Sequence, residues 1–389
     1  MYSALRRILF ALEAERAHDV GVGALAAASR SKTLCALLAR LNRERIADLP
    51  VEVMGMRFPN PVGLAAGLDK HARAGNALHA LGFGFVELGT VTPLPQPGNS
   101  RPRLFRIENH NALINRMGFN SVGLAAFCRN IARAGDGDNP RIITGTGTGT
   151  GDNGNNARII TGVNIGKNAA TAFDKSADDY IACLDAAHEF ADYVALNISS
   201  PNTPNLRDLQ HVDALDPLLS VLDRRRMQLA DAHGRRVPLA LKISPDLDAA
   251  ALDTVANLAR KRRIDAVAAT NTTSSRAGVE AHALANESGG LSGAPLADVA
   301  TATVARLFRN LQGEIPIIGV GGVDSAARAL EKFQAGADLV QIYTGFIYRG
   351  PGLIRDIVDA LRAQTGDQTL REFLAGLRAR HEHAPAHNA

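Results

Sequence analysis

Short apolar runs recur along the chain beyond Pro50, and each of them ends in Gly, Asn, Ser or Thr. Runs of about four to eight hydrophobic residues bounded by turn residues are typical of strands that are buried in a parallel sheet. We predict eight such strands, at residues 62–66, 85–90, 162–166, 193–199, 239–244, 266–270, 316–321 and 339–343. Helical stretches lie between most of them, for example at 176–190, 249–261, 298–310 and 325–335.

This alternation of strands and helices predicts an α/β protein with a (β/α)₈ barrel, the TIM barrel fold. A doubly wound sheet is the alternative, but no GxGxxG sequence opens a helix after the first strand. One barrel takes about 250 residues or more, and we assign residues 46–370 of the 389-residue chain to it. Residues 371–389 are expected to hold the end of a C-terminal helix and a disordered tail.

Residues 1–45 carry a different pattern, which predicts an extension of two short helices. Leu5, Ile8, Leu9 and Leu12 share one helical face, and several arginines lie nearby. One interpretation is a helix pair that packs on its own domain, and the pattern alone favours it. The other is a basic amphipathic anchor that lies on an anionic membrane surface.

Composition narrows the class of protein. The chain is 46% hydrophobic and 21% charged, which is typical of a soluble globular protein with a sizeable core. Its net charge of +4 comes from scattered Lys and Arg, so we predict no nucleic-acid partner. Three cysteines without a CxxC spacing indicate neither a disulfide framework nor a metal site. No apolar run reaches the ~18 residues that a membrane span needs.

Residues 141–162 contain a tandem repeat. The pentapeptide RIITG at 141–145 returns at 158–162, with Gly, Thr and Asn between the copies. A phosphate-binding loop would end in GK followed by Ser or Thr, which is missing, so a flexible low-complexity insertion is the better interpretation. The insertion precedes the third strand. We therefore place it on the face of the barrel opposite the active rim, with its second copy entering the strand.

The ends of the predicted strands carry the candidate chemistry, because active sites of (β/α)₈ barrels lie there. Each strand ends in a polar side chain or a glycine turn, and these residues are Lys70, Thr90, Asn164, Asn197, Ser200, Lys242, Thr270, Asn271, Gly321, Gly322, Tyr343 and Thr344. The glycine-rich turn after strand seven and the Tyr-Thr-Gly turn after strand eight predict a phosphate site, because backbone N–H groups at these turns bind phosphate oxygens.

A phosphate site combined with lysines and amides favours flavin mononucleotide (FMN) over a sugar phosphate. The reduced flavin is anionic near N1 and O2, and Lys242 is the candidate cation. A solvated charge or a Schiff-base lysine, as in aldolase barrels, is the alternative for this residue. The loop at 197–203 holds two serines between asparagines. It lacks a nucleophile-elbow glycine pattern, which argues against acyl transfer and favours proton removal by a serine.

A series of motifs resembles the dihydroorotate dehydrogenases of class 2, which are membrane-associated and quinone-dependent. The motifs are AAGLDK at 65–70, ELGTVTP at 87–93, RPRLFR at 101–106, NRMGFN at 115–120, NIGKN at 164–168, NISSPNTP at 197–204, ATNTT at 269–273, GGLSG at 289–293, GVGGV at 319–323 and QIYTG at 341–345. The sequence ERAH at 15–18 is similar to the N-terminal extension of that class. The resemblance covers the chain from about residue 1 to residue 365.

The resemblance implies roles in the oxidation of dihydroorotate to orotate. Ser200 would remove the proton from C5, with Thr203 and Phe119 beside it, whereas class 1 relatives use a cysteine. The substrate would contact Lys70, Asn115, Arg116, Met117, Gly118, Phe119, Asn197, Asn202, Asn271 and Thr272. One FMN per chain would contact Ala66, Gly67, Lys70, Thr90, Asn164, Asn197, Lys242, Thr270, Gly293, Gly322, Tyr343 and Thr344. His18 and Arg106 would face a quinone tunnel.

The resemblance also implies partners and a location. With a membrane quinone as the acceptor, the amphipathic interpretation of residues 1–45 becomes the stronger one, because the quinone enters from lipid. We expect a monomer bound peripherally to the cytoplasmic side of the cell membrane. Asn205, where the family has Gly, and the insertion depart from the family pattern. Two alternatives stay open: an FMN barrel for another pyrimidine or a hydroxy acid, and a flavin-binding barrel impaired by the insertion.

Overall fold

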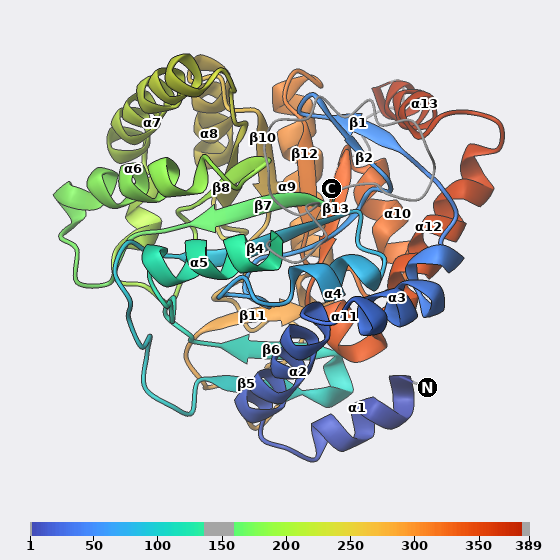
Figure 1. The fold of residues 1–389 in the computed structure, drawn as a ribbon. Helices are drawn as coiled ribbons and strands as arrows, with labels where there is room; N and C mark the ends of the chain where they lie inside the picture. Colours follow the sequence, from blue (N-terminus) through green and yellow to red (C-terminus); the bar gives the residue numbers. More distant parts are fainter. Residues whose placement is uncertain (1, 136–158, 383–389) are drawn as a thin grey trace.

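Eight parallel strands form a closed barrel at the centre of the molecule (Figure 1). The computed structural model describes residues 2–135 and 159–382. In order around the barrel, the strands are β3 (Val62–Leu64), β4 (Phe85–Val91), β7 (Ile160–Ile165), β8 (Tyr193–Asn197), β9 (Leu239–Ile243), β10 (Ala266–Ala269), β12 (Ile317–Val320) and β13 (Leu339–Ile342). All eight predicted strands are confirmed, and all except β4 end one or two residues earlier than predicted.

Helices surround the barrel, because each strand is followed by a segment that returns the chain to the opposite end. These helices are α4 (Gly75–Ala80), α5 (Leu124–Gly135), α6 (Ser176–Ala187), α7 (Val212–His233), α8 (Ala249–Lys261), α9 (Ala297–Leu311), α10 (Ala326–Gln334), α11 (Thr344–Arg349) and α12 (Gly352–Thr365). The helices predicted at 176–190, 249–261, 298–310 and 325–335 are confirmed as α6, α8, α9 and α10. Helix α6 is three residues shorter than predicted.

A hairpin of β1 (Val51–Val53) and β2 (Met56–Phe58) packs at the end of the barrel where the strands begin. Phe58 is fully buried, and its ring centroid lies 5.2 Å from that of Phe85 at the start of β4. A glycine makes room for this pair, since a Cβ on Gly63 would lie 2.3 Å from the Phe85 ring. The hydrophobic pattern does not predict the hairpin, because three-residue strands leave no periodic signal.

A second sheet, also absent from the prediction, borders the opposite end of the barrel. It contains β5 (Leu104–Ile107), β6 (Ala112–Asn115) and β11 (Gly290–Gly293), which pair in antiparallel fashion with β6 in the middle. Ile107, Ala112 and Leu291 of this sheet belong to a small hydrophobic cluster that is separate from the main core. Asn115, at the end of β6, pairs in register with both Leu104 and Gly290.

The N-terminal extension contains three helices, so the prediction of two is wrong. They are α1 (Tyr2–Phe10), α2 (Ala14–Ser29) and α3 (Lys32–Leu41). The break between α2 and α3 occurs because the Ser31 hydroxyl accepts a hydrogen bond from the Leu34 N–H at 3.2 Å and caps a new helix. Helix α2 packs against α4 and β5, and the Tyr2 hydroxyl of α1 donates to the Ile347 carbonyl at 2.5 Å.

One face of the extension remains uncovered. Leu5, Ile8, Leu34 and Leu37 of α1 and α3 are 50%, 68%, 47% and 52% exposed. Within residues 2–135 and 159–382, no single helix has the length and apolar character of a membrane span. The bent pair Ala14–Ser29 and Lys32–Arg45, with 110° between its halves, meets that test by length and composition only.

Two predicted segments are described in part. Strand β7 begins at Ile160, so the second copy of the repeat enters the third barrel strand as predicted, whereas residues 141–158 of the insertion lie outside the described residues. Residues 370–382 form helix α13 (Leu370–Glu382), whose Phe373 and Leu374 are buried. The remainder of the predicted tail, residues 383–389, also lies outside the described part of the chain.

Candidate active site

A cavity opens where the barrel strands end, and its empty volume, including the solvent-open mouth, is about 1190 Å³. Most of the predicted site residues line this cavity: His18, Ala66, Gly67, Lys70, Thr90, Asn115, Met117, Gly118, Phe119, Asn197, Ser200, Asn202, Lys242, Thr270, Asn271, Thr272, Gly293, Gly322, Tyr343 and Thr344. They come from segments spread over more than 300 residues of the sequence. Most lie together because the parallel barrel strands all end at the same rim, whereas His18 comes from α2, residues 115–119 from β6 and the segment after it, and Gly293 from β11.

Four predicted residues do not line the cavity. Asn164 lies behind the wall, bonded to the side chains that form it. Arg116 and Thr203 line a second pocket, on the other side of the loop that carries Ser200. Arg106 of β5 donates a short hydrogen bond to the Leu12 carbonyl and stacks over the Phe10 ring, at 4.6 Å from its centroid. Arg106 therefore holds the connection between α1 and α2.

Amide and hydroxyl side chains form a continuous hydrogen-bond network across one wall. The Thr90 hydroxyl donates to Asn164 Oδ1 at 2.5 Å, and Asn197 Nδ2 donates to the Thr90 hydroxyl at 3.0 Å. Asn271 Nδ2 in turn donates to Asn197 Oδ1 at 3.2 Å and to the Ser199 hydroxyl at 3.0 Å. Buried polar side chains that satisfy one another in this way hold a fixed orientation. A planar polar ligand would therefore meet preset donors and acceptors.

Ser200 lies on the loop that follows β8, and only 6% of the residue is exposed. Its hydroxyl accepts a hydrogen bond from the Asn202 N–H at 3.3 Å. Asn202 is held in turn, because its Nδ2 donates to Asn115 Oδ1 at 3.1 Å. The Thr203 hydroxyl is buried and has no hydrogen-bond partner among the described residues. Asn205 has φ +55°, so this loop does need a residue that tolerates the left-handed region.

A carboxylate that the sequence analysis does not single out lies beneath the cavity. Glu87 of β4 is fully buried, and its Oε1 accepts from Asn164 Nδ2 at 2.8 Å and from Lys242 Nζ at 3.5 Å. Its Oε2 accepts from the Tyr193 hydroxyl at 3.0 Å and from Gln341 Nε2 at 2.8 Å. Burial and this carboxylate raise the pKa of Tyr193 well above its ordinary value. The only acidic residue in a predicted buried strand was the feature of the sequence that could have indicated this buried carboxylate.

The side of the cavity nearest the N-terminal helices holds a group of titratable side chains. Burial, followed by the charges of Lys70 and His71, lowers the pKa of His18 to about 3. Burial also lowers the pKa of Lys70, to about 8, even though the Glu15 carboxylate acts in the opposite direction. His18 is therefore neutral at neutral pH, whereas Lys70 is mostly protonated.

Helix α2 is fixed beside the cavity by a buried ion pair that the sequence analysis also misses. Arg103 Nη2 and Nε donate to Glu15 Oε1 at 2.8 Å and 3.1 Å. Arg103 Nε also donates to Glu15 Oε2 at 3.2 Å. Arg103 Nη1 donates to the Pro97 and Asn99 carbonyls at 2.7 Å each. The guanidinium thus joins the extension to the barrel and orients the helix that carries His18.

Glycine turns let backbone groups approach the cavity closely at its far end. Gly322 has φ +72°, and a Cβ there would lie 2.1 Å from Ala297 Cα. Gly293 has φ +99°, and a Cβ there would lie 2.1 Å from the Asn111 carbonyl. Side chains are therefore excluded at both positions. Both glycines line the cavity, so backbone rather than a side chain borders it there, as a phosphate site would need.

Comparisons with known proteins agree on one family. The family model described as dihydroorotate dehydrogenase matches residues 48–364. The dihydroorotate dehydrogenase (quinone) of Nitrosospira multiformis is 50% identical over 362 residues, which cover 93% of this chain and 96% of that relative. The enzyme of that name from Shewanella sp. (strain W3-18-1) is 47% identical, with 93% and 99% covered.

Solved structures agree with the sequence relatives. The crystal structure of DHODH from Eimeria tenella in complex with ferulenol superposes with a TM-score of 0.78 at 34% sequence identity. The match covers 90% of this chain and 94% of that one. Fold, matched length and sequence identity point the same way, and the chain belongs to the dihydroorotate dehydrogenase family, in its quinone-dependent class 2.

Proposed function

We propose that this chain oxidises (S)-dihydroorotate to orotate in pyrimidine biosynthesis and passes the electrons to a membrane quinone. The observation that carries the proposal is the gathering of Ser200, Lys70 and four asparagines around one cavity. This set offers a proton acceptor, a cation for a carboxylate and amides for a planar ring. The relatives named dihydroorotate dehydrogenase (quinone) support the same reaction.

FMN is the cofactor that we propose for this site. Bound FMN would accept the hydride from C6 of the substrate and supply the electrons for the quinone. The residues fit it at both ends. Gly322 and Thr344 border the cavity where the backbone could hold a phosphate. Thr90, Asn197 and Lys242 offer hydroxyl, amide and ammonium groups to the ring system. We also propose contacts with Ala66, Gly67, Lys70, Thr270, Gly293 and Tyr343, with Asn164 behind the wall supporting Thr90 and Asn197.

Ser200 is the proposed base, and it removes the proton from C5 of dihydroorotate. A serine hydroxyl is a weak base in water, so the reaction needs a closed site with little water. The near-complete burial of Ser200 supports this requirement. Phe119 lines the same cavity, and Thr203 is the proposed next carrier, since its buried hydroxyl has no other partner among the described residues.

Amides and cationic side chains would hold the substrate in front of Ser200. Asn115 and Asn202 are already fixed by their mutual hydrogen bond, which leaves the remaining amide atoms for the ligand. The Lys70 ammonium is the proposed partner of the orotate carboxylate. The other proposed contacts are Arg116, Met117, Gly118, Phe119, Asn197, Asn271 and Thr272.

The N-terminal helices are the proposed entry for the quinone. Neutral His18 lines the cavity on that side, and the exposed leucines and Ile8 of α1 and α3 form an apolar face suited to lipid. Arg106 would border this entry from β5. We further propose that the protein is a monomer and that it binds peripherally to the cytoplasmic face of the membrane.

Anaerobic mixing of the purified protein with dihydroorotate tests the proposal. We expect the visible absorbance of the flavin to bleach and then to recover on addition of a short-chain quinone, but not with fumarate or NAD⁺. A yellow protein that does not bleach would favour an FMN barrel for another substrate. A colourless protein would overturn the cofactor assignment and favour a barrel impaired by the insertion.

A further inference from the structure

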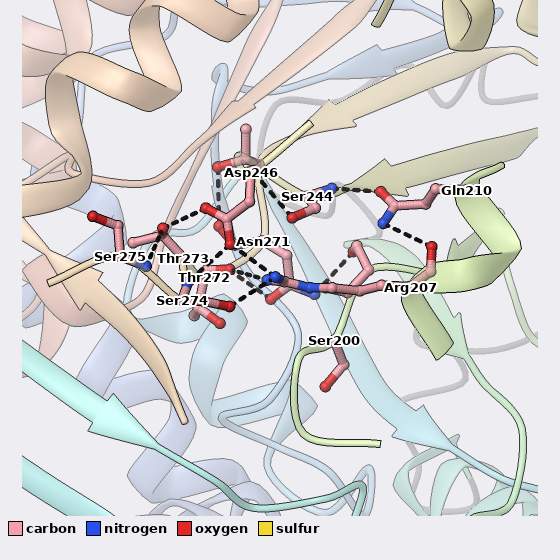
Figure 2. Close-up of polar contacts among 12 residues, drawn as sticks. Ser200, Arg207, Gln210, Ser244, Asp246, Asn271, Thr272, Thr273, Ser274 and Ser275 are labelled. Atoms are coloured by element: carbon pink, nitrogen blue, oxygen red, sulfur yellow. Dashed lines mark hydrogen bonds and ion pairs between the residues drawn. The ribbon is translucent and has the colours of Figure 1, made fainter. Parts of the chain in front are cut away.

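The Arg207 side chain joins two loops that face the cavity (Figure 2). Its Nε donates to the Ser199 carbonyl at 3.2 Å, directly before Ser200 in the loop after β8. Its Nη2 donates to the Thr272 carbonyl at 3.0 Å, in the loop after β10. Its Nη1 donates to Asp246 Oδ2 and to the Ser274 hydroxyl at 2.8 Å each. One guanidinium thus satisfies four acceptors in a fixed plane.

Asp246 completes the arrangement from the loop after β9 (Figure 2). Its Oδ1 accepts a short hydrogen bond from the Thr273 hydroxyl, and its Oδ2 accepts from the Ser274 N–H at 2.8 Å. The Asp246 N–H donates to the Ser244 hydroxyl at 3.1 Å. Ser244 is bound in turn through its N–H to Gln210 Oε1 at 2.8 Å. Three successive strand-end loops are therefore tied together by side chains.

The ion pair at the centre of this arrangement is largely shielded from water. The side chains of Arg207 and Asp246 are 24% and 27% exposed. Burial by itself would raise the pKa of Asp246, but the hydrogen bonds from Thr273, the Ser274 N–H and Arg207 outweigh it and hold that pKa below its ordinary value. Asp246 is therefore a carboxylate at neutral pH, and the charge-assisted bonds from Arg207 keep their geometry.

The arrangement lies behind residues that face the cavity. Ser200 and Thr272 line the cavity. Arg207 binds the backbone carbonyl of Ser199, next to Ser200, and the backbone carbonyl of Thr272. Arg207 lines the second pocket, and Ser200 lines both pockets. The lining residues of the second pocket include neither His18 nor any residue of the N-terminal helices. A displacement of Arg207 would therefore move the substrate side of the site and leave the proposed quinone side in place.

We propose that Arg207 and Asp246 are positioning residues that fix the Ser200 loop against the loop after β10 and so set the distance from the Ser200 hydroxyl to the substrate. The inference rests on the proposed function of Ser200 as the base. Removal of the guanidinium frees the Ser199 and Thr272 carbonyls at once. A misplacement of about 1 Å in a reacting group costs on the order of 100-fold in rate.

Arg207→Gln, Arg207→Lys and Asp246→Asn holoenzymes test the inference in two separate half-reactions. We expect flavin reduction by dihydroorotate to slow by about 10- to 100-fold in Arg207→Gln, with flavin reoxidation by a short-chain quinone within about two-fold of wild type. Arg207→Lys keeps the charge but loses the planar fork, so we expect it to restore little of the reduction rate. Asp246→Asn keeps the shape, and we expect a smaller loss.

Arg225→Gln is the matched control. Arg225 forms a fork of 2.6 Å and 2.9 Å with Asp185 on the outer helices, so this variant removes a similar ion pair away from the cavity. We expect both of its half-reactions to match wild type. Flavin content and the unfolding midpoint identify variants that fail to fold, and Asp246→Asn carries the test if Arg207→Gln is one of them.

The outcomes separate the inference from the proposed function. Wild-type flavin that is not bleached by dihydroorotate would overturn the proposed function, whatever the variants do. Wild-type bleaching together with full-speed reduction in folded Arg207→Gln would overturn only the positioning role. Equal slowing of reduction and reoxidation would also overturn it, because general loosening of the barrel affects both sides of the site.

Discussion

Glu87 and Lys242 form an ion pair inside the barrel, with 3.5 Å between Oε1 and Nζ. Their side chains are 0% and 6% exposed, so neither charge is compensated by bulk water. Tyr193 and Gln341 donate to the second carboxylate oxygen. Because the ion pair lies directly below the cavity that Lys242 lines, its position and charge affect whatever binds above.

Replacement of Glu87 by Gln should destabilise the protein strongly. The variant leaves the Lys242 ammonium buried without its counter-charge, which costs about 3–5 kcal/mol of unfolding free energy. Glu314→Gln is the control, since Glu314 pairs with Arg260 at only 2.9 Å but is 57% exposed, and such pairs contribute below about 1 kcal/mol. Urea unfolding of both variants measures the difference. Equal losses would contradict the expectation that burial makes the Glu87–Lys242 pair the stronger one.

Replacement of Ser200 by Ala should leave the flavin bound and slow its reduction by dihydroorotate about 10²- to 10⁴-fold, because the proposed base is lost. Stopped-flow bleaching of the flavin gives the rate, and reoxidation by quinone is the internal control. Ser200→Cys is a second control, since it returns a group able to accept the proton. Bleaching of Ser200→Ala at the wild-type rate would remove Ser200 from the proposed role.

Replacement of Gly322 by Ala should abolish flavin binding. The new Cβ would meet the Ala297 backbone at 2.1 Å, so the Gly322 turn that we propose for the phosphate would have to shift. Gly313→Ala separates this effect from backbone strain, because Gly313 has a similar φ of +76° and a Cβ added there would meet nothing within 4 Å. It should cost about 1–2 kcal/mol of stability and retain flavin. The absorbance ratio of flavin to protein distinguishes the two.

The free energy of unfolding should decrease as the pH falls, partly because of His18. Its pKa is about 3 in the folded protein and about 6.5 when it is exposed in the unfolded chain. Between these values the unfolded state binds more protons, so the contribution is complete above pH ~6.5 and is lost as the pH falls toward 3. His18→Asn should therefore show a shallower loss of unfolding free energy between pH 6.5 and 4. Identical slopes for variant and wild type would contradict the burial of a neutral His18.

The barrel was predictable because its physical cause is local. A strand buried on both faces is mostly apolar, and β4, β7, β8 and β9 are buried at every residue, with only a few polar side chains among them. Turn residues then mark each strand end. The rim of the site followed from the same rule, since parallel strands deliver their last residues to one face. The left-handed conformation of Asn205 was also foreseeable from its residue type.

The short strands and the break between α2 and α3 were not predictable in this way. Strand β11 exists because Gly290 meets Asn115 across 175 residues of sequence, and neither strand has a periodic pattern of its own. The prediction of two N-terminal helices failed because one hydrophobic pattern continued through the cap at Ser31. Pairing and capping of such short elements depend on contacts that the folded chain supplies.

The sequence by itself determined the barrel, the family and the set of polar residues at the strand ends, because hydrophobic periodicity and motif spacing are properties of the chain alone. Only the tertiary structure decided which charges meet. Glu87 and Lys242 are 155 residues apart, Arg103 and Glu15 are 88 apart, and Arg207 and Asp246 are 39 apart. The sequence does not indicate which partner a charged residue will have. The energy of an ion pair depends on its burial and on the geometry of the groups that folding brings close together.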